Sequence, residues 1–380
     1  MEHTGGTKDG EEHNLIKSNL RQRPYNSCYP LNGPGLRVVA YLFVFSLLVI
    51  SIHAEPRKEP RTLFPIMRNG QWGYMDRTGK VMIDFLFQEA YSFYEGLGMV
   101  LKDGKYGYID QSGEMVIPPQ FNGARRFSEG LASVSIEGKR KPPIREVIGG
   151  KWGYIDKKGR FVIPLQFDSA EEFTEGLAAI QIGGKWGYID KKGETITGPQ
   201  FVEAYDYSEG LGIVKVGGNY RGRGGKWGYI DKRGNYVLQP QFDNAGEFVG
   251  GIAPVKVGRK WAYIDRKGKV VIDSISCNWA SRFSEGLARI DGSYFINKKG
   301  GKAIELQRFE AEDFSEGMAA IRTGTLNSSR NGYINKKGEI VIKPQFADAW
   351  PFWGGLAMVV ERNRIIYIDK TGKVVWKPES

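Results

Sequence analysis

One eight-residue motif recurs nine times between residues 72 and 372, and this repetition limits the folds open to the chain more than any other feature. The motif Trp-Gly-Tyr-Ile-Asp-Lys-Lys-Gly stands at residues 152–159 and again at 186–193, and the other copies are variants of it. The interval between copies is 34 residues in four of eight cases, and insertions lengthen three of the others. A period of 20–50 residues is typical of arrays whose units share one core. The aromatic residue after the glycine position marks each copy: Tyr74, Tyr108, Tyr154, Tyr188, Tyr229, Tyr263, Phe295, Tyr333 and Tyr367.

The second half of each motif predicts a tight hairpin turn. An Asp or Asn begins it in all nine copies, and a glycine follows three residues later. The short carboxylate or amide accepts hydrogen bonds from the turn amides, and glycine takes the positive φ that closes the turn without a steric clash. These turn glycines are Gly79, Gly113, Gly159, Gly193, Gly234, Gly268, Gly300, Gly338 and Gly372.

Each unit is predicted to be a three-stranded antiparallel meander, so the fold class is all-β. Strand B begins Trp-Gly-Tyr, strand C is the apolar run after the turn, and strand A is the run before the tryptophan, such as residues 177–182. Nine units then fill residues 63–378, from a first strand A at 63–67 to a last strand C at 374–376. The linkers between units carry Phe and Ala at i, i+3 and i+6, as in Phe167, Ala170 and Phe173, which predicts one helical turn with its apolar side inward.

The tryptophan and the tyrosine of strand B share one face of the strand, because strand side chains alternate. They are either core anchors that stack unit on unit or an exposed aromatic strip that binds sugars. Stacked repeats bury a continuous core, which favours the first interpretation. The array is either an open solenoid or superhelix, or a closed propeller-like toroid; nine units exceed the usual 4–8 blades, which favours the open form. The tryptophans assigned to the core are Trp72, Trp152, Trp186, Trp227 and Trp261.

The repeated unit resembles a known family. The runs KWGYIDKKG, VIPPQF and FSEGLA are similar to the WG repeat, which is also called the KWG repeat. The resemblance covers residues 63–378, nearly all of the chain after the first sixty residues. It implies a bacterial repeat protein, and it indicates no activity, because the members of this family are mostly of unknown function.

The first sixty residues differ from the repeats. Residues 1–37 are polar and mixed in charge, so we expect a disordered region. Residues 38–52 are uncharged and mostly apolar, and residues 38–54 are therefore predicted to be a cleaved secretory signal peptide or, alternatively, an uncleaved anchor. Signal peptides have short amino-terminal regions, so a true start near Leu36 is one explanation of the long leader. Either form predicts export across the inner membrane, to the periplasm, the cell surface or the medium.

The distribution of histidine argues against most enzyme mechanisms. The three histidines are His3, His13 and His53, and the rest of the chain has none. A Ser-His-Asp triad, a histidine base and a His-ligated metal are therefore excluded from the repeats. The repeated Asp residues are explained as turn residues, and no pair stands out for glycoside hydrolysis. We expect a protein that is not an enzyme and that uses no cofactor and no metal.

Two surfaces are candidates for a partner. All large insertions fall between strands A and B, and insertions collected on one face often mark the binding face of a repeat protein. The six basic residues proposed to contact a partner are Lys139, Arg140, Lys141, Arg145, Arg221 and Arg223. The turns between strands B and C form a second candidate, because 14 of their 18 central residues are Lys or Arg. A row of glutamates recurs in the linkers.

These features predict an exported, non-catalytic scaffold that binds another protein. The alternative is a module that binds carbohydrate, cell wall or another anionic surface, with an anionic polysaccharide or lipid as the ligand of the basic turns. Solvated lysines that keep strand edges from pairing also explain those turns. No nucleic acid is expected, because the chain is predicted to be exported and has no nucleic-acid-binding motif.

Overall fold

The computed structural model describes residues 62–378, apart from residues 142–143, 219–223, 307–308 and 325–328. The predictions for residues 1–37 and 38–54 lie outside the described residues. Every regular element in the described part is a β-strand, as the repeats predict. None of the described residues belongs to a helix long and apolar enough to cross a membrane.

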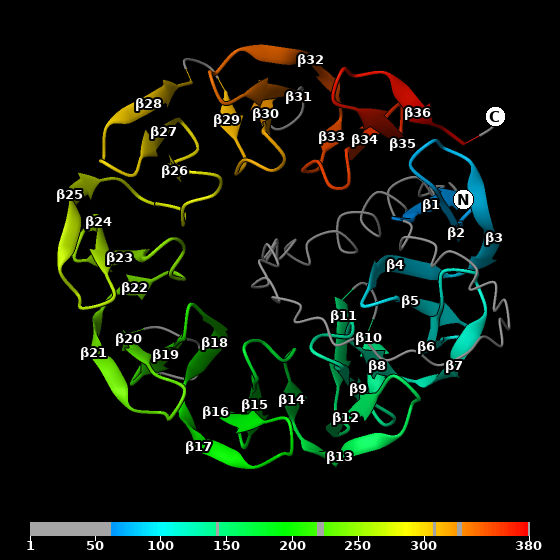
Figure 1. Ribbon diagram of the computed structural model, residues 1–380, viewed down its shortest axis with the longest axis horizontal. Coiled ribbons are helices and arrows are strands. Elements are labelled where there is room, and N and C mark those ends of the chain that lie inside the picture. The colour runs from blue at the N-terminus through cyan, green and yellow to red at the C-terminus, as the bar shows by residue number, and fades with distance from the viewer. Residues whose placement is uncertain (1–61, 142–143, 219–223, 307–308, 325–328, 379–380) are drawn as a thin grey trace, which may run out of the picture. The chain divides into compact units, whose positions relative to one another are not determined.

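Residues 62–378 form nine small antiparallel sheets that follow one another around a ring, and we call each sheet a blade (Figure 1). Blade 1 holds β1 (Phe64–Arg68), β2 (Gln71–Met75) and β3 (Val81–Phe87). Blade 2 holds β4 (Glu89–Tyr94), β5 (Leu97–Lys102), β6 (Lys105–Ile109) and β7 (Met115–Phe121). Blade 3 holds β8 (Gly123–Ala124), β9 (Leu131–Ser135), β12 (Trp152–Asp156) and β13 (Phe161–Phe167), with an inserted hairpin of β10 (Lys139–Lys141) and β11 (Ile144–Ile148).

The remaining six blades repeat this order. Blade 4 holds β14 (Ser169–Ala170), β15 (Leu177–Ile182), β16 (Lys185–Asp190) and β17 (Thr195–Phe201). Blade 5 holds β18 (Glu203–Ser208), β19 (Leu211–Val216), β20 (Lys226–Ile230) and β21 (Tyr236–Phe242). Blade 6 holds β22 (Asn244–Ala245), β23 (Ile252–Val257), β24 (Lys260–Asp265) and β25 (Val270–Ser276). Blade 7 holds β26 (Leu287–Ile290), β27 (Tyr294–Asn297) and β28 (Lys302–Glu305). Blade 8 holds β29 (Glu310–Ala311), β30 (Met318–Thr323), β31 (Arg330–Asn335) and β32 (Ile340–Phe346), and blade 9 holds β33 (Asp348–Ala349), β34 (Leu356–Glu361), β35 (Arg364–Asp369) and β36 (Val374–Trp376).

Most blades contain a fourth strand that the sequence did not predict. In blade 4 it is β14, which pairs with strand A through Ser169↔Gln181 and Ala170↔Ile180. The predicted helical turn is therefore wrong: Phe167 ends strand C, Ala170 lies in the short strand, and Phe173 packs on Tyr154 with ring centroids 4.7 Å apart. The free edge of strand A presents unpaired backbone groups, and a two-residue strand satisfies them better than a helical turn does.

The glycine after the tryptophan permits a close crossing of strands B and C. A Cβ atom on Gly153 would lie 2.6 Å from the carbonyl oxygen of Ile163. The strand register jumps at the same place, because Trp152 pairs with Phe167 while Tyr154 pairs with Ile163, so strand C bulges toward the glycine. In blade 7 the position holds Tyr294, and no register shift occurs between it and the next residue. In blade 6 the position holds Ala262 and the register still shifts between Trp261 and Tyr263, so the bulge does not require glycine in every blade.

The aromatic residues of strand B form the core between blades, as predicted. Tyr188 is fully buried, and its ring centroid lies 5.0 Å from that of Tyr207 in the next blade. Its hydroxyl donates a 2.6 Å hydrogen bond to the Tyr205 carbonyl oxygen of that blade. Equivalent hydroxyl bonds recur at Tyr74, Tyr108, Tyr154, Tyr229, Tyr263 and Tyr333. Of the five predicted core tryptophans, Trp72, Trp152, Trp227 and Trp261 are buried and Trp186 is half-buried.

The turn between strands B and C has the predicted geometry. The Asp156 carboxylate accepts hydrogen bonds from the amides of Lys158 and Arg160, and Gly159 closes the turn at a φ of +78°. All nine turn glycines have a positive φ. They also pack against the neighbouring blade, which the sequence did not predict: a Cβ atom on Gly159 would lie 3.2 Å from the Ile117 side chain of blade 2.

Blade 9 contacts blade 1 and closes the ring. Tyr367 donates a 2.7 Å hydrogen bond to the Pro65 carbonyl oxygen, the same hydroxyl that joins the other blades. Phe64 lies between Trp353 and Tyr367, with ring centroids 5.4 and 5.8 Å apart. The array is thus the closed toroid, and the open form favoured by the number of units is wrong. Among the described residues no strand is exchanged at this junction, because β1–β3 and β33–β36 are separate sheets.

Candidate interaction surfaces

The meander gives the ring two different faces. The turns between strands A and B lie on one face, which we call the A–B face. The turns between strands B and C lie on the other, together with the Glu-Gly turns that precede strand A, and we call it the B–C face. The two candidate partner surfaces of the sequence therefore lie on opposite sides of the ring.

Ion pairs between blades hold the B–C face together. Glu175, before strand A of blade 4, lies 3.1 Å from the Lys232 ammonium of blade 5 and accepts a 2.9 Å hydrogen bond from the Gly210 amide. Its φ of +53° costs about 1–2 kcal/mol, and the two contacts offset that strain. The same ion pair recurs at five other junctions: Glu95–Lys157, Glu129–Lys191, Glu209–Arg266, Glu285–Lys336 and Glu316–Lys370.

The pairing changes the interpretation of the basic turns. In six blades the first basic residue of the turn is neutralised by the linker glutamate of the preceding blade, so the two rows of opposite charge largely pair with each other. In blade 1, Arg77 instead donates a hydrogen bond to the Gly354 carbonyl oxygen. A second basic residue, where a turn has one, stays exposed to solvent. In four blades the Asp that begins the turn lies two residues before this second basic residue. This face is therefore of mixed charge. The exposed cations, none of which has an ion pair among the described residues, are Lys158, Lys192, Arg233, Lys267, Lys299 and Lys337.

The A–B face carries the insertions. In blade 3 the insertion forms the hairpin β10–β11, with Lys139 opposite Ile148 and Arg140 opposite Val147. Lys141 lies in β10 and Arg145 in β11, so the structure brings these four predicted residues onto one hairpin. The other two, Arg221 and Arg223, lie outside the described residues.

The short strands β8 and β14 and the strand β18 lie at the inner ends of their blades (Figure 1), and charged residues occur in or directly after them. Arg126 forms a 2.6 Å ion pair with Glu172 of the next blade. Asp206 follows on blade 5, and burial together with the nearby charges of Glu171, Glu172 and Glu247 raises its pKa to about 7. Arg126, Glu172 and Asp206 each stand two residues after the alanine of their linker, and this shared position is the feature by which the sequence could have indicated the cluster. The described residues contain no group of three or more His, Cys, Asp or Glu that could hold a metal ion.

We expect Asp206→Asn to stabilise the protein at pH 8 and to have little effect at pH 4. The folded-state pKa of about 7 lies above the ordinary aspartate pKa of 3.8, so the wild type loses stability as pH rises through this window. Removing the charge should recover on the order of 1–2 kcal/mol at pH 8, because partial exposure screens the repulsion. Melting temperatures of both proteins between pH 4 and pH 8 test this. Parallel curves would contradict it.

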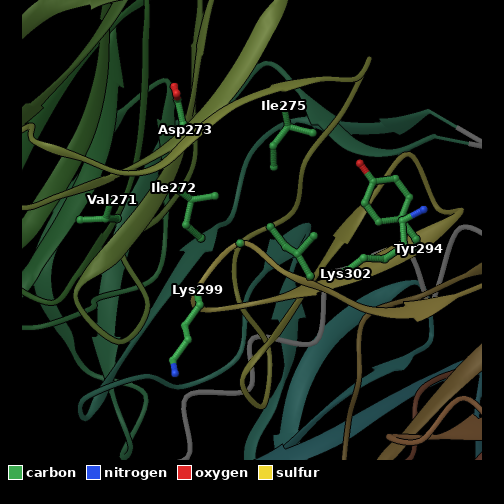
Figure 2. Close-up of a pocket in the computed structure, with 9 residues that line it drawn as sticks. Val271, Ile272, Asp273, Ile275, Tyr294, Lys299 and Lys302 are labelled. Atoms are coloured by element: carbon green, nitrogen blue, oxygen red, sulfur yellow. The ribbon is translucent and has the colours of Figure 1, made fainter.

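Two hollows interrupt the regular surface, and both lie at degenerate repeats. The first has a volume of about 490 Å³ and lies between blades 6 and 7. Figure 2 shows Val271, Ile272 and Ile275 on one side of it and Tyr294 and Lys302 on the other. The Lys302 ammonium lies 4.7 Å from the Tyr294 ring centroid, and the walls combine aliphatic side chains with Asp273, Lys299 and Lys302. The second hollow, of about 520 Å³, lies on the A–B face at blades 7 to 9.

A closed ring of small antiparallel sheets repeated radially is a β-propeller, and this one has nine blades. The chain belongs to the family described as WG containing repeat, whose profile matches residues 72–106, 106–139, 152–186, 186–220, 227–261, 261–291, 295–324 and 332–364. Each matched segment begins at strand B of one blade and extends toward the next. The family resemblance seen in the sequence is therefore confirmed.

Solved structures share the architecture at low sequence identity. A crystal structure of the eukaryotic initiation factor is 11% identical, covers 84% of this chain and 96% of its own, and superposes with a TM-score of 0.58. That similarity shows the fold alone. AztD of Citrobacter koseri is 13% identical over 84% of this chain and 93% of its own, but its TM-score of 0.40 is too low to support an argument. No curated protein matches the chain.

Proposed function

We propose that this propeller is an exported, non-catalytic scaffold that binds a partner protein through its A–B face. The proposal rests on one observation. The turns between strands A and B differ in length from blade to blade, whereas the turns between strands B and C have four residues in every blade. The propeller fold and the absence of histidine after residue 53 support a binding role without chemistry. The apolar run at residues 38–52 supports export, as a signal peptide or as an anchor.

The construction of the two faces explains why a partner would meet the A–B face. On the B–C face, ion pairs join the turns of six blades to the preceding blade, so an insertion in one of these turns would break a junction. On the A–B face, the turn glycine bonds within its own blade: the Gly183 amide donates a 2.7 Å hydrogen bond to Asp168. The ion pair that crosses the junction there, Lys151–Asp168, uses the residue before the tryptophan and not the inserted segment. Inserted segments can therefore project without disturbing their neighbours. Their composition, with Lys139, Arg140, Lys141 and Arg145 in one hairpin, suits an acidic protein surface.

The chain offers a well-matched deletion. Removing residues 137–148 leaves Ile136-Gly149-Gly150-Lys151, the same four residue types as Ile182-Gly183-Gly184-Lys185 of blade 4. Both glycine pairs already share the turn conformation, since Gly149 and Gly150 have φ of +73° and +79°, and Gly183 and Gly184 have +59° and +76°. We expect this variant to melt within about 2 °C of the wild type, because surface changes rarely exceed about 0.5 kcal/mol.

Binding should respond differently from stability. Wild type and deletion variant are used to capture proteins from envelope fractions, and the enriched protein is then titrated against each. We expect at least tenfold weaker binding by the deletion variant. Lys158→Ser is the control on the B–C face, because Ser112 occupies the same turn position in blade 2. Equal binding by the deletion variant, or loss of binding in the control alone, would contradict the proposal.

A further inference from the structure

The second hollow lies at three successive blades, 7 to 9, that lack the repeated tryptophan, with Ile365 at its position in blade 9. Strand B begins with Trp in five blades, but the position holds Ser293 in blade 7 and Asn331 in blade 8. In blade 5, Trp227 stacks on Tyr205 at 5.4 Å and lies 5.2 Å from the Lys215 ammonium. The equivalents of these two neighbours in blade 8 are Glu312 and Arg322, and both line the hollow. The hollow is therefore the space that a tryptophan fills elsewhere.

A different tryptophan forms one wall of this space. Trp279 stands in the linker before blade 7, and it is 40% exposed, whereas four of the five repeated tryptophans are buried. The carboxylate of Asp291 accepts hydrogen bonds of 2.9 and 2.8 Å from the amides of Asn278 and Trp279, which fixes the backbone there. The Arg289 guanidinium lies 4.6 Å from the indole. An indole held in place and partly open to solvent offers a flat apolar surface at little entropic cost.

The rest of the lining is mostly polar and holds both hydrogen-bond donors and acceptors, with acceptors in excess. Arg322 is half-buried, and its guanidinium makes no ion pair or hydrogen bond with any of the described residues. Acceptors are supplied by Asp291, Glu310, Glu312 and Asp348, and an amide group by Asn278. The Asn331 amide already donates to the Phe346 and Ala347 carbonyl oxygens. The carboxylates outnumber the two arginines, so an anionic ligand is disfavoured. Hydroxyl groups, which both donate and accept, match such a lining better than an apolar side chain does.

We infer that the hollow formed by Trp279, Arg289, Asp291, Glu310, Arg322 and Asn331 binds a pyranose unit of a neutral glycan. The apolar face of the sugar ring lies on the exposed part of the Trp279 indole. Its hydroxyls donate to the carboxylates and accept from Arg322. The volume of about 520 Å³ is in the range of small-molecule sites. This inference is independent of the partner-binding hairpin, which is on blade 3.

The test uses the full chain and a panel of neutral oligosaccharides, including β-1,4-linked dimers of glucose and of N-acetylglucosamine. We expect saturable binding of at least one of them by calorimetry and a change in tryptophan fluorescence. Trp279→Ala should weaken binding at least tenfold. Tyr236→Ala is the matched control, because Tyr236 is also partly exposed but lies on the outer strand of blade 5.

A second variant guards against a folding defect. Asn331→Trp restores the Trp-Gly-Tyr motif of the other blades and should fill the hollow. We expect it to abolish binding while keeping or raising the melting temperature, an outcome that a misfolded protein would not give. No binding by any neutral glycan, binding only by sulfated or uronic acid glycans, or undiminished binding by both variants would overturn the inference.

Discussion

Replacing Gly187 by valine should destabilise the protein by more than about 4 kcal/mol, the range reached when a side chain is forced into a packed backbone. Gly187 is the glycine after the tryptophan in blade 4, and a Cβ atom there would lie 2.8 Å from the Gly198 carbonyl carbon. The obstacle is the backbone of strand C, which the bulge holds against strand B. To accept the side chain, strand C must give up the bulge, and Phe201 at its end must then leave the core.

Gly198→Val is the matched control for this prediction. Gly198 lies in the same blade, on β17, and a Cβ atom there meets no atom within 4 Å. We expect it to be neutral or slightly stabilising, since valine favours strands and glycine does not. Urea denaturation of the three proteins measures the difference. Equal midpoints for the two variants would show that the crossing of strands B and C tolerates a side chain.

Replacing Phe64 by alanine should cost about 3–5 kcal/mol and should loosen the junction where the ring closes. Phe64 is 1% exposed and packs on both Trp353 and Tyr367. Elsewhere the linker joins successive blades covalently, whereas blades 9 and 1 are held by side-chain and hydrogen-bond contacts alone. The cavity left by Phe64 therefore weakens the one junction that the chain does not cross.

Hydrogen exchange distinguishes this effect from a general loss of stability. In Phe64→Ala we expect amides of blades 1 and 9 to lose protection first, while blades 4 to 6 keep it. Phe248→Ala removes an equivalent ring between blades 5 and 6, where it packs 4.9 Å from Tyr229, and blades 1 and 9 should stay protected. Uniform loss of protection in both variants would contradict a separable closing junction.

Local chemistry made much of the fold predictable from the sequence. The Asp and Gly of each turn act through contacts within five residues, so residues such as Asp156 and Gly159 identify the hairpins directly. The short inner strand was missed because Ser169 and Ala170 are too few to show a period. Closure was missed because it depends on the angle between blades, which no single residue sets; the contact of Phe64 with Tyr367 spans nearly the whole array.

The surfaces were less predictable, because they depend on which blades become neighbours. Glu95 and Lys157 are separated by 62 residues in sequence, and only the ring shows that they neutralise each other. The hollow at blades 7 to 9 arises because Ser293 and Asn331 are smaller than the tryptophan that occupies their position in other blades. The sequence did contain one indication, since Trp279 stands outside the repeated tryptophan position. Only the structure shows that Trp279 lies beside the positions where the repeated tryptophan is missing.

The closure without strand exchange has a consequence for how such a ring changes during evolution. Each blade is formed by one consecutive stretch of the sequence, and the last junction uses the same tyrosine hydroxyl as the others. Unequal recombination between two copies therefore inserts or removes a whole blade with its contacts intact, and any pair of neighbours can become the ends of the chain. The number of blades in the ring is then set by the angle between neighbouring blades, which small changes at each junction can alter. No dedicated closing strand is needed to set it.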